Sequence, residues 1–272
     1  MLALIRGAGD LASGIALRLW RSGISVALTE LPRPTVIRRT VSFADAVTDG
    51  VMTVEGVTAR LAADAREAKK LLAQGVIPVL ADPECRCREE LKPDIVVDAI
   101  LAKRNLGTRI TDANIVVGVG PGFTAGEDCH AVVETMRGHT LGRALYRGSA
   151  LPNTNIPGLL GGFAGERVLR APADGVFEGT KKIRDLVREG DVVGYVAGVP
   201  MCATVSGVLR GLLADGVEVK RGMKSGDVDP RGEVSYCDTV SDKASAVGGG
   251  VLEAILHLSG TLREKESGGE GE

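Results

Sequence analysis

A glycine-rich turn set between two apolar segments constrains this chain more than any other feature. Residues 2–5 are apolar and β-prone, residues 7–14 carry three glycines, and residues 15–20 mix apolar side chains with small and basic ones. Gly23 ends the helix that this pattern predicts, and a second apolar segment, 25–29, follows it. The order strand, turn, helix, strand predicts the first unit of a parallel α/β sheet.

The turn has the spacing of a dinucleotide-binding loop, G-x-G-x-x-A. In such a loop the first glycine makes the turn, the second lets the backbone approach a pyrophosphate, and the small residue allows close helix packing. Free N–H groups at the helix start suit phosphate, and an acid 23 positions (30 − 7) after the first glycine suits ribose hydroxyls. The predicted cofactor-binding residues are Gly7, Gly9, Asp10, Leu11, Ala12 and Glu30. The alternative is a unit that binds no nucleotide and keeps its glycines for packing.

Two further segments are expected near the same crevice. Arg33, Arg38 and Arg39 follow the second apolar segment, and they form either a phosphate clamp or a solvated basic face. A second glycine-rich loop, with Gly120 and Gly122, follows a later apolar segment. Because the carboxyl ends of parallel strands lie at one edge of a sheet, this loop either contacts phosphates or is a structural turn.

Composition limits the classes of function. Of the 272 residues, 44% are hydrophobic and only 3% are aromatic, which fits an α/β core built from aliphatic side chains. A net charge of −2 without a long basic run argues against nucleic-acid binding. No apolar run reaches the roughly 18 residues of a membrane span, and no leader is recognisable, so we expect a cytoplasmic protein without membrane contact. Five cysteines without a framework spacing fit reduced thiols.

Thiol and metal interpretations rest on few residues. Cys85 and Cys87 form a C-x-C pair, but no second pair accompanies them, and the role of Cys129 is left open. His130 and Glu134 would share one face of a helix. The apolar runs around them instead predict a hairpin, in which residues four apart are separated by about 13 Å. No metal site is therefore expected.

The second half of the chain contains a repeat with an offset of 32 residues (203 − 171). Ala171 aligns with Ala203, and Gly190 aligns with Gly222. Two such copies cannot bury their apolar faces alone, so they should interlock. The pattern resembles a biotinyl/lipoyl-like barrel-sandwich domain, although the turn between the copies lacks the lysine that such domains modify.

The expected fold class is α/β, with a Rossmann-like parallel sheet followed by a β-rich barrel-sandwich domain. We expect the nucleotide-binding domain over residues 1–148 and the duplicated β domain over 159–234. A helix over 241–258 is expected to pack back on the first domain, and the charged, glycine-rich tail over 261–272 is expected to be disordered.

Several stretches together resemble the YqeB family of accessory proteins for selenium-dependent molybdenum hydroxylases, distant relatives of XdhC-type maturation factors. Among them are IRGAGDLASGIALRLWRSG (5–23), GVGPGFTAGEDCHAVVETMRGHTLGR (118–143) and SDKASAVGGGVLEAIL (241–256). The resemblance implies a role in maturing or inserting a molybdenum pterin cofactor. It also implies a molybdenum hydroxylase or a cofactor-handling protein as partner, and it assigns no catalytic residue.

Two other functions stay open at this point. A free-standing NAD-dependent oxidoreductase needs a proton donor at the crevice, for which the sequence offers Lys103. A binding module that reports the NAD redox state to a partner needs no such group. The expected ligand is thus a NAD-like dinucleotide or a molybdenum pterin cofactor, and a further candidate partner is a second copy of the chain.

Overall fold

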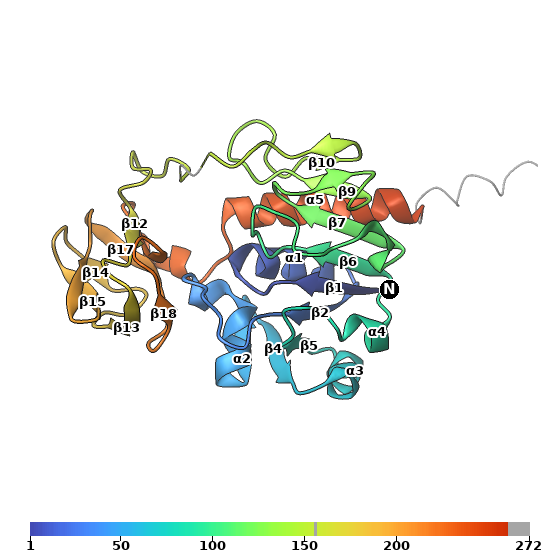
Figure 1. Ribbon diagram of the computed structural model, residues 1–272, viewed down its shortest axis with the longest axis horizontal. Coiled ribbons are helices and arrows are strands. Elements are labelled where there is room, and N and C mark those ends of the chain that lie inside the picture. The colour runs from blue at the N-terminus through green and yellow to red at the C-terminus, as the bar shows by residue number, and fades with distance from the viewer. Residues whose placement is uncertain (155–156, 261–272) are drawn as a thin grey trace, which may run out of the picture.

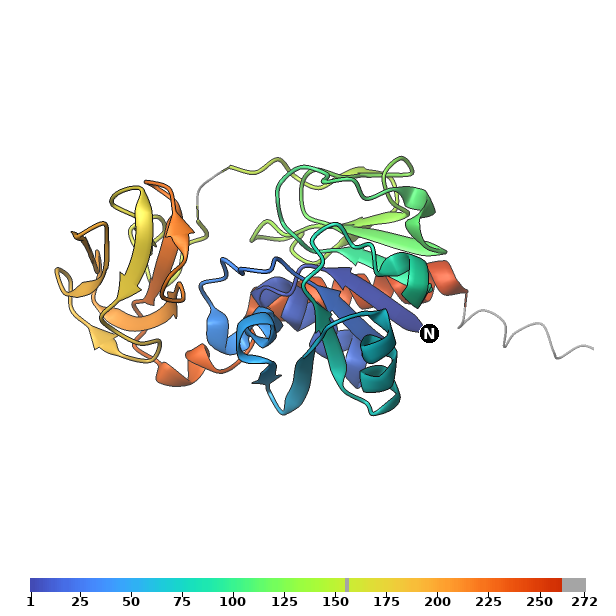
Figure 2. The same cartoon turned by 60° about the horizontal axis from the view of Figure 1, so that its bottom comes forward.

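The computed structural model describes residues 1–154 and 157–260 (Figure 1). It consists of an α/β body and a smaller β body at one end, which are joined by the chain before β12 and the chain after β19 (Figures 1 and 2). The tail over 261–272, predicted to be disordered, lies outside the described residues.

A nine-stranded sheet forms the centre of the α/β body, in the order β10-β9-β7-β6-β1-β2-β5-β4-β3. Its strands are β1 (Leu2–Arg6), β2 (Ser25–Thr29), β3 (Val51–Val54), β4 (Val57–Ala62), β5 (Ile77–Leu80), β6 (Ile95–Asp98), β7 (Ile115–Val119), β9 (Ala131–Val133) and β10 (Ala144–Leu145). A two-stranded ribbon, β8 (Thr124–Ala125) and β11 (Gly148–Ser149), lies beside it.

Helices cover both faces of the sheet because its central strands are apolar on both faces. The helices are α1 (Asp10–Arg21), α2 (Ala46–Asp49), α3 (Ala65–Ala73), α4 (Arg88–Leu91) and α5 (Asp242–Ser259). Ile5 of β1 packs in one cluster with α1 and α5, whereas its neighbour Leu4 packs with α3 and α4. This alternation follows from the period of two along a strand.

The expectation of a parallel sheet is wrong at both edges. β3 pairs with β4 and β10 pairs with β9 in antiparallel orientation, so the sheet is mixed. In each case a short loop returns the chain beside the strand it has just left, which only an antiparallel pair allows. The hairpin predicted around His130 and Glu134 is confirmed by the β9–β10 pairing.

The β body contains two four-stranded antiparallel sheets, in the orders β12-β19-β17-β14 and β16-β15-β13-β18. Its strands are β12 (Val168–Arg170), β13 (Gly175–Gly179), β14 (Leu186–Val187), β15 (Val192–Val196), β16 (Val199–Cys202), β17 (Gly207–Leu212), β18 (Glu218–Val219) and β19 (Lys224–Asp229). Strands related by the 32-residue repeat lie in opposite sheets, and each sheet contains two strands from each copy. The two copies therefore share one core around Phe177 and Leu209.

Glycines bring α5 close to α1 and to the β9–β10 hairpin. A Cβ built on Gly14 of α1 would lie 2.7 Å from the Cβ of Ala244, and one built on Gly248 would lie 3.0 Å from the Gly14 carbonyl oxygen. Because Gly14 meets Ala244 while Arg18, further along α1, meets Gly248, the two helices run in the same direction. Their N-termini therefore lie at the same end of the α/β body.

Direct contacts join the two bodies at residues 37–40. The Leu212 N–H donates to the Ile37 carbonyl at 2.8 Å, and a guanidinium N–H of Arg39 donates to the Leu213 carbonyl at 3.5 Å. The Thr40 hydroxyl donates to the carbonyl of Cys237, which lies on the chain that leads from the β body to α5. These contacts fix the β body beside the N-terminus of α1.

Candidate functional site

A cavity of about 670 Å³ lies where the two bodies meet. Its wall includes the N-termini of α1 and α5, the segment 36–38, the chain before β12, and residues of β17 and β19. The charged side chains of the wall are mostly cationic, with seven basic residues against Asp10 and Asp227. The basic residues are Arg38, Lys103, Arg137, Arg167, Arg210, Lys224 and Lys243.

The N-terminus of α1 opens into this cavity. Gly9 is the N-cap residue and has no side chain to bond the first N–H groups of the helix. Gly7 has φ +97°, and a Cβ there would lie 2.9 Å from the Ala99 carbonyl oxygen, so the turn requires glycine. The Asp10 carboxylate accepts the Leu11 N–H at 2.9 Å. Unpaired N–H groups and the helix dipole favour an anion at such a position.

The N-terminus of α5 forms a second part of the wall. The Ser241 hydroxyl caps this helix by accepting the Ala244 N–H at 3.1 Å. Arg137 donates two hydrogen bonds to Asp242, at 2.6 and 2.8 Å, and so fixes the start of α5 to the α/β body. Since α1 and α5 point the same way, the positive ends of both helix dipoles face the cavity.

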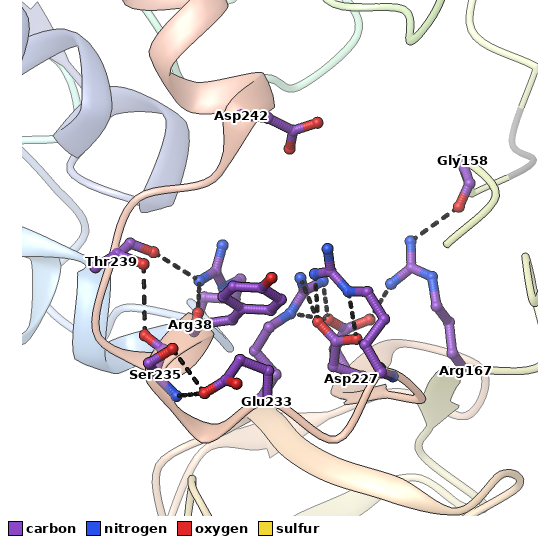
Figure 3. A network of polar contacts seen from close by, with 12 residues as sticks. Arg38, Gly158, Arg167, Asp227, Glu233, Ser235, Thr239 and Asp242 are labelled. Atoms are coloured by element: carbon purple, nitrogen blue, oxygen red, sulfur yellow. Dashed lines mark hydrogen bonds and ion pairs between the residues drawn. The ribbon is translucent and has the colours of Figure 1, made fainter. Parts of the chain in front are cut away.

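Arg38 is a buried cation of the cavity wall, with 7% of its surface exposed. One guanidinium nitrogen donates to the Tyr236 and Thr239 carbonyls at 2.9 and 3.3 Å (Figure 3). Its Nη1 is 3.9 Å from the Asp10 carboxylate, and its buried Nε has no partner within the described residues. Burial lowers the pKa of Arg38 from its ordinary value. The site thus keeps a partly unsatisfied cation out of bulk water.

The β body contributes two arginines that one buried carboxylate orients. Asp227, 1% exposed, accepts hydrogen bonds from both Arg167 and Arg210 (Figure 3). Arg210 also pairs with Asp229 at 3.1 Å. Arg167 donates to the Gly158 carbonyl at 3.2 Å, and its Nε, like that of Arg38, is buried without a partner in the described part of the chain.

Two lysines complete the cationic wall. Lys224 begins β19, Lys243 lies in the first turn of α5, and neither ammonium group has an ion pair within residues 1–154 and 157–260. The Lys224 side chain keeps contact with solvent inside the cavity, but the surrounding walls remove much of its hydration. This desolvation lowers the pKa of Lys224 and of Lys243.

The predicted cofactor-binding residues divide into two groups. Gly9, Asp10, Leu11 and Arg38 line the cavity together. The remaining predicted residues do not line it: Gly7, Ala12, Glu30, Arg39, Gly120 and Gly122.

The second group has structural contacts of its own. The Glu30 carboxylate accepts the Ala8 N–H at 2.9 Å and the Leu31 N–H at 2.7 Å, so it holds the glycine turn. Arg39 pairs with Asp45 at 3.1 Å.

The second glycine-rich loop is tightly packed. A Cβ on Gly120 would lie 2.9 Å from the Thr135 hydroxyl, and one on Gly122 would lie 2.6 Å from the Arg104 backbone. Pro121, between these glycines, lines the cavity instead.

Sequence reasoning missed the cations that come from the second half of the chain. Arg167, Arg210, Lys224 and Lys243 are far from the glycine turn in sequence, and no motif marks them. Asp227 lies in β19, and no sequence pattern indicates that its carboxylate orients two arginines toward the cavity.

The residues considered for thiol or metal chemistry are engaged elsewhere. Cys85 and Cys87 are buried in the apolar cluster under α3, and the hydrogen bond from Cys87 lowers the pKa of Cys85. The His130 Nδ1 accepts the Val116 N–H at 3.0 Å, and Glu134 accepts three backbone N–H groups. Within the described residues, no three His, Cys, Asp or Glu side chains are arranged to hold a metal ion.

The fold and the cavity first define a class: a two-body α/β protein with a cation-lined cavity between the bodies. The chain is 56% identical over 257 residues to the Escherichia coli K12 protein described as uncharacterized protein YqeB. That match covers 94% of this chain but 48% of the relative, so the chain spans about half the length of the curated relative. Over these residues the chain belongs to the YqeB family. No protein-family profile matches it.

Among solved structures, the chain is similar to proteins of the succinylglutamate desuccinylase/aspartoacylase group. A protein from Rhodobacter sphaeroides is 24% identical, with a TM-score of 0.22 over 23% of this chain and 22% of that one. An aspartoacylase family protein from Mesorhizobium loti is 12% identical, with a TM-score of 0.27 over 84% of each chain. Such TM-scores are too low to support an argument from the shared fold, so no hydrolase activity is inferred.

These findings correct two expectations. The Rossmann-like plus barrel-sandwich fold class is replaced by a mixed α/β sheet joined to paired antiparallel sheets, since both edges of the nine-stranded sheet are antiparallel. The expected role as a molybdenum hydroxylase maturation factor is withdrawn, because the description of the relative, uncharacterized protein YqeB, names no such role. The oxidoreductase and NAD-responsive alternatives are withdrawn with it.

The sequence predicts no segment long and apolar enough to span a membrane. Of the helices in the described part of the chain, none combines the length and the apolar character that a bilayer crossing requires.

Proposed function

We propose that the cavity binds a small molecule that carries two or more anionic groups, at least one of them a phosphate. The observation that carries this proposal is the convergence of seven basic side chains and two helix N-termini on one cavity of about 670 Å³. Within that wall, Arg38 is buried, and burial lowers its pKa. An anionic ligand would offset the cost of holding this cation out of water.

Phosphate fits the donors of the wall better than a single carboxylate does. Guanidinium groups present parallel N–H donors that match two oxygens of a phosphate, and lysines add charge without fixing direction. Backbone N–H groups at a helix N-terminus add a third kind of donor. The cofactor classes expected from the sequence, a NAD-like dinucleotide and a molybdenum pterin cofactor, both contain phosphate and stay predictions.

Partner and location also stay proposals. A molybdenum hydroxylase, a cofactor-handling protein or a second copy of the chain would each be tested by co-purification. All five cysteines are free, which supports a reducing compartment such as the cytoplasm.

Calorimetric titration with pyrophosphate tests the proposed function. We expect the protein to bind pyrophosphate and Lys224→Met to weaken binding by about tenfold or more, on the scale of one charge-assisted hydrogen bond. Lys220→Met is the matched control, because Lys220 lies in the same β body with its side chain 85% exposed in an ion pair with Asp174. Absence of binding by the unmodified protein, or equal losses in both variants, would contradict the proposal.

The pH dependence of anion binding provides a second prediction. Burial lowers the pKa values of Lys224 and Lys243 in the free protein, and a bound anion favours their protonated forms. Affinity for sulfate, whose own charge is constant here, should therefore fall as pH rises from about 7 to about 10, before an ordinary lysine with pKa near 10.4 loses its proton. The decline should be shallower in Lys224→Met, and an unchanged affinity over this range would exclude the lysines from the site.

A further inference from the structure

Asp10 places a negative charge in the wall of the cavity, which is unexpected for a site that binds only anions. Its side chain is 37% exposed and lines the cavity at the first helical position of α1. A negative charge there stabilises the helix, but it repels an anionic ligand bound at the same N-terminus. The other acid of the wall, Asp227, is buried and already accepts from two arginines.

Asp10 has capacity for another hydrogen bond. Its Oδ1 accepts the Leu11 N–H, whereas its Oδ2 is 3.9 Å from Arg38 Nη1, which is beyond hydrogen-bond distance. A carboxylate has about four lone-pair positions, so Oδ2 can accept from a donor in the cavity. No hydrogen bond to this oxygen occurs within residues 1–154 and 157–260.

The surroundings decide what kind of donor fits. Arg38 from the segment before η1 (Arg39–Val41), Lys224 from β19 and Lys243 from α5 all interact electrostatically with Asp10. A ligand ammonium group would be repelled by these three cations, which already balance the carboxylate. A neutral hydroxyl adds no charge, and it can donate to Asp10 while its oxygen accepts from a neighbouring cation.

From this arrangement we propose that Asp10 selects ligands that carry a hydroxyl group close to the phosphate, as in a polyol or sugar phosphate. This inference rests on the proposed anion site and names its ligand class. If the bound anion has no hydroxyl group, the Asp10 carboxylate receives no hydrogen bond from the ligand and lies close to the negative charge of that ligand. A hydroxylated phosphate turns the same carboxylate into a hydrogen-bond partner, and sites built around such a bond discriminate strongly against analogues that lack the hydroxyl.

The test compares two phosphates of similar size, sn-glycerol 3-phosphate and n-propyl phosphate, by calorimetric titration. We expect the unmodified protein to bind glycerol phosphate about tenfold more tightly or better. Asp10→Ala should abolish the preference, mainly because propyl phosphate binds this variant more tightly. Asp10→Asn keeps the Leu11 hydrogen bond with its one acceptor oxygen but replaces Oδ2 by an amide N–H donor, so it should lose the preference as well.

Equal affinities of the unmodified protein for the two phosphates would overturn the role of Asp10, and so would a preference that survives in Asp10→Ala. Pyrophosphate serves as the reference for the site itself. Binding of pyrophosphate without discrimination between the two phosphates refutes the selectivity and keeps the anion site. If the unmodified protein binds none of the three ligands, both the anion site and the selectivity of Asp10 are refuted. Thermal unfolding of each variant shows whether α1 keeps its fold.

Discussion

Replacement of Gly250 by alanine should destabilise the protein by about 3 kcal/mol or more, because the new methyl group has no room. A Cβ on Gly250 would lie 1.9 Å from the Gly142 carbonyl oxygen and 2.9 Å from a methyl carbon of Val133. The nearest atom to this Cβ belongs to the backbone and cannot rotate away. In the other direction, a Cβ built on Gly142, which has φ +79°, would lie 2.5 Å from the Ala246 carbonyl oxygen. The helix must therefore move away from the β9–β10 hairpin.

Gly249→Ala is the matched control for this prediction. Gly249 precedes Gly250 in the same helix, and a Cβ there meets nothing within 4 Å. Alanine should stabilise α5 at this position by about 0.5–1 kcal/mol, the difference in helix propensity. Thermal and urea unfolding measure the difference in stability between the Gly250→Ala and Gly249→Ala variants. Equal stabilities would show that α5 does not pack against the hairpin as the structure has it.

Replacement of Asp227 by asparagine should cost about 3 kcal/mol of stability and also weaken pyrophosphate binding. Asp227 is 1% exposed and compensates Arg167 and Arg210, with an Arg210 guanidinium nitrogen at 2.6 Å. A neutral amide has one acceptor oxygen and no charge, so Arg167 loses its carboxylate partner and Arg210 keeps only its pair with Asp229. Both arginines line the cavity, and the loss of their orientation should reduce affinity as well.

Asp174→Asn provides the reference for an exposed pair in the same β body. Asp174 and Lys220 are 3.2 Å apart, with side chains 60% and 85% exposed, so solvent screens this pair and the substitution should barely change the stability. Urea unfolding gives the stabilities, and titration with pyrophosphate gives the affinities. A loss for Asp227→Asn no larger than that for Asp174→Asn would contradict the buried network of Figure 3.

Local spacing accounts for what the sequence could predict. The glycine turn and α1 follow from a few neighbouring residues, and the β9–β10 hairpin follows from two short apolar runs. Gly9, Asp10 and Leu11 were found for the same reason, since a helix N-terminus is a local structure. Glu30 shows the limit of spacing: the acid directly follows β2, but its carboxylate accepts hydrogen bonds from the N–H groups of Ala8 and Leu31.

The remainder of the site depends on contacts between distant segments. Lys224 reaches the cavity because the 32-residue repeat interlocks in one core, and Lys243 because glycines let α5 pack beside α1. Asp227 orients Arg167 and Arg210 toward the cavity, and it is separated from them by 60 and 17 positions in the sequence. No local pattern encodes such pairings, so the sequence located one wall of the cavity and missed the opposite one.

The most direct test of the central claim is to locate a heavy anion in crystals of the protein grown with tungstate. We expect an anomalous peak inside the cavity, beside the N-terminus of α1 and within reach of Lys224 or Arg38. Tungstate found only on outer surfaces of the two bodies, with this cavity holding none at saturating concentration, would contradict the anion site and the function proposed for it.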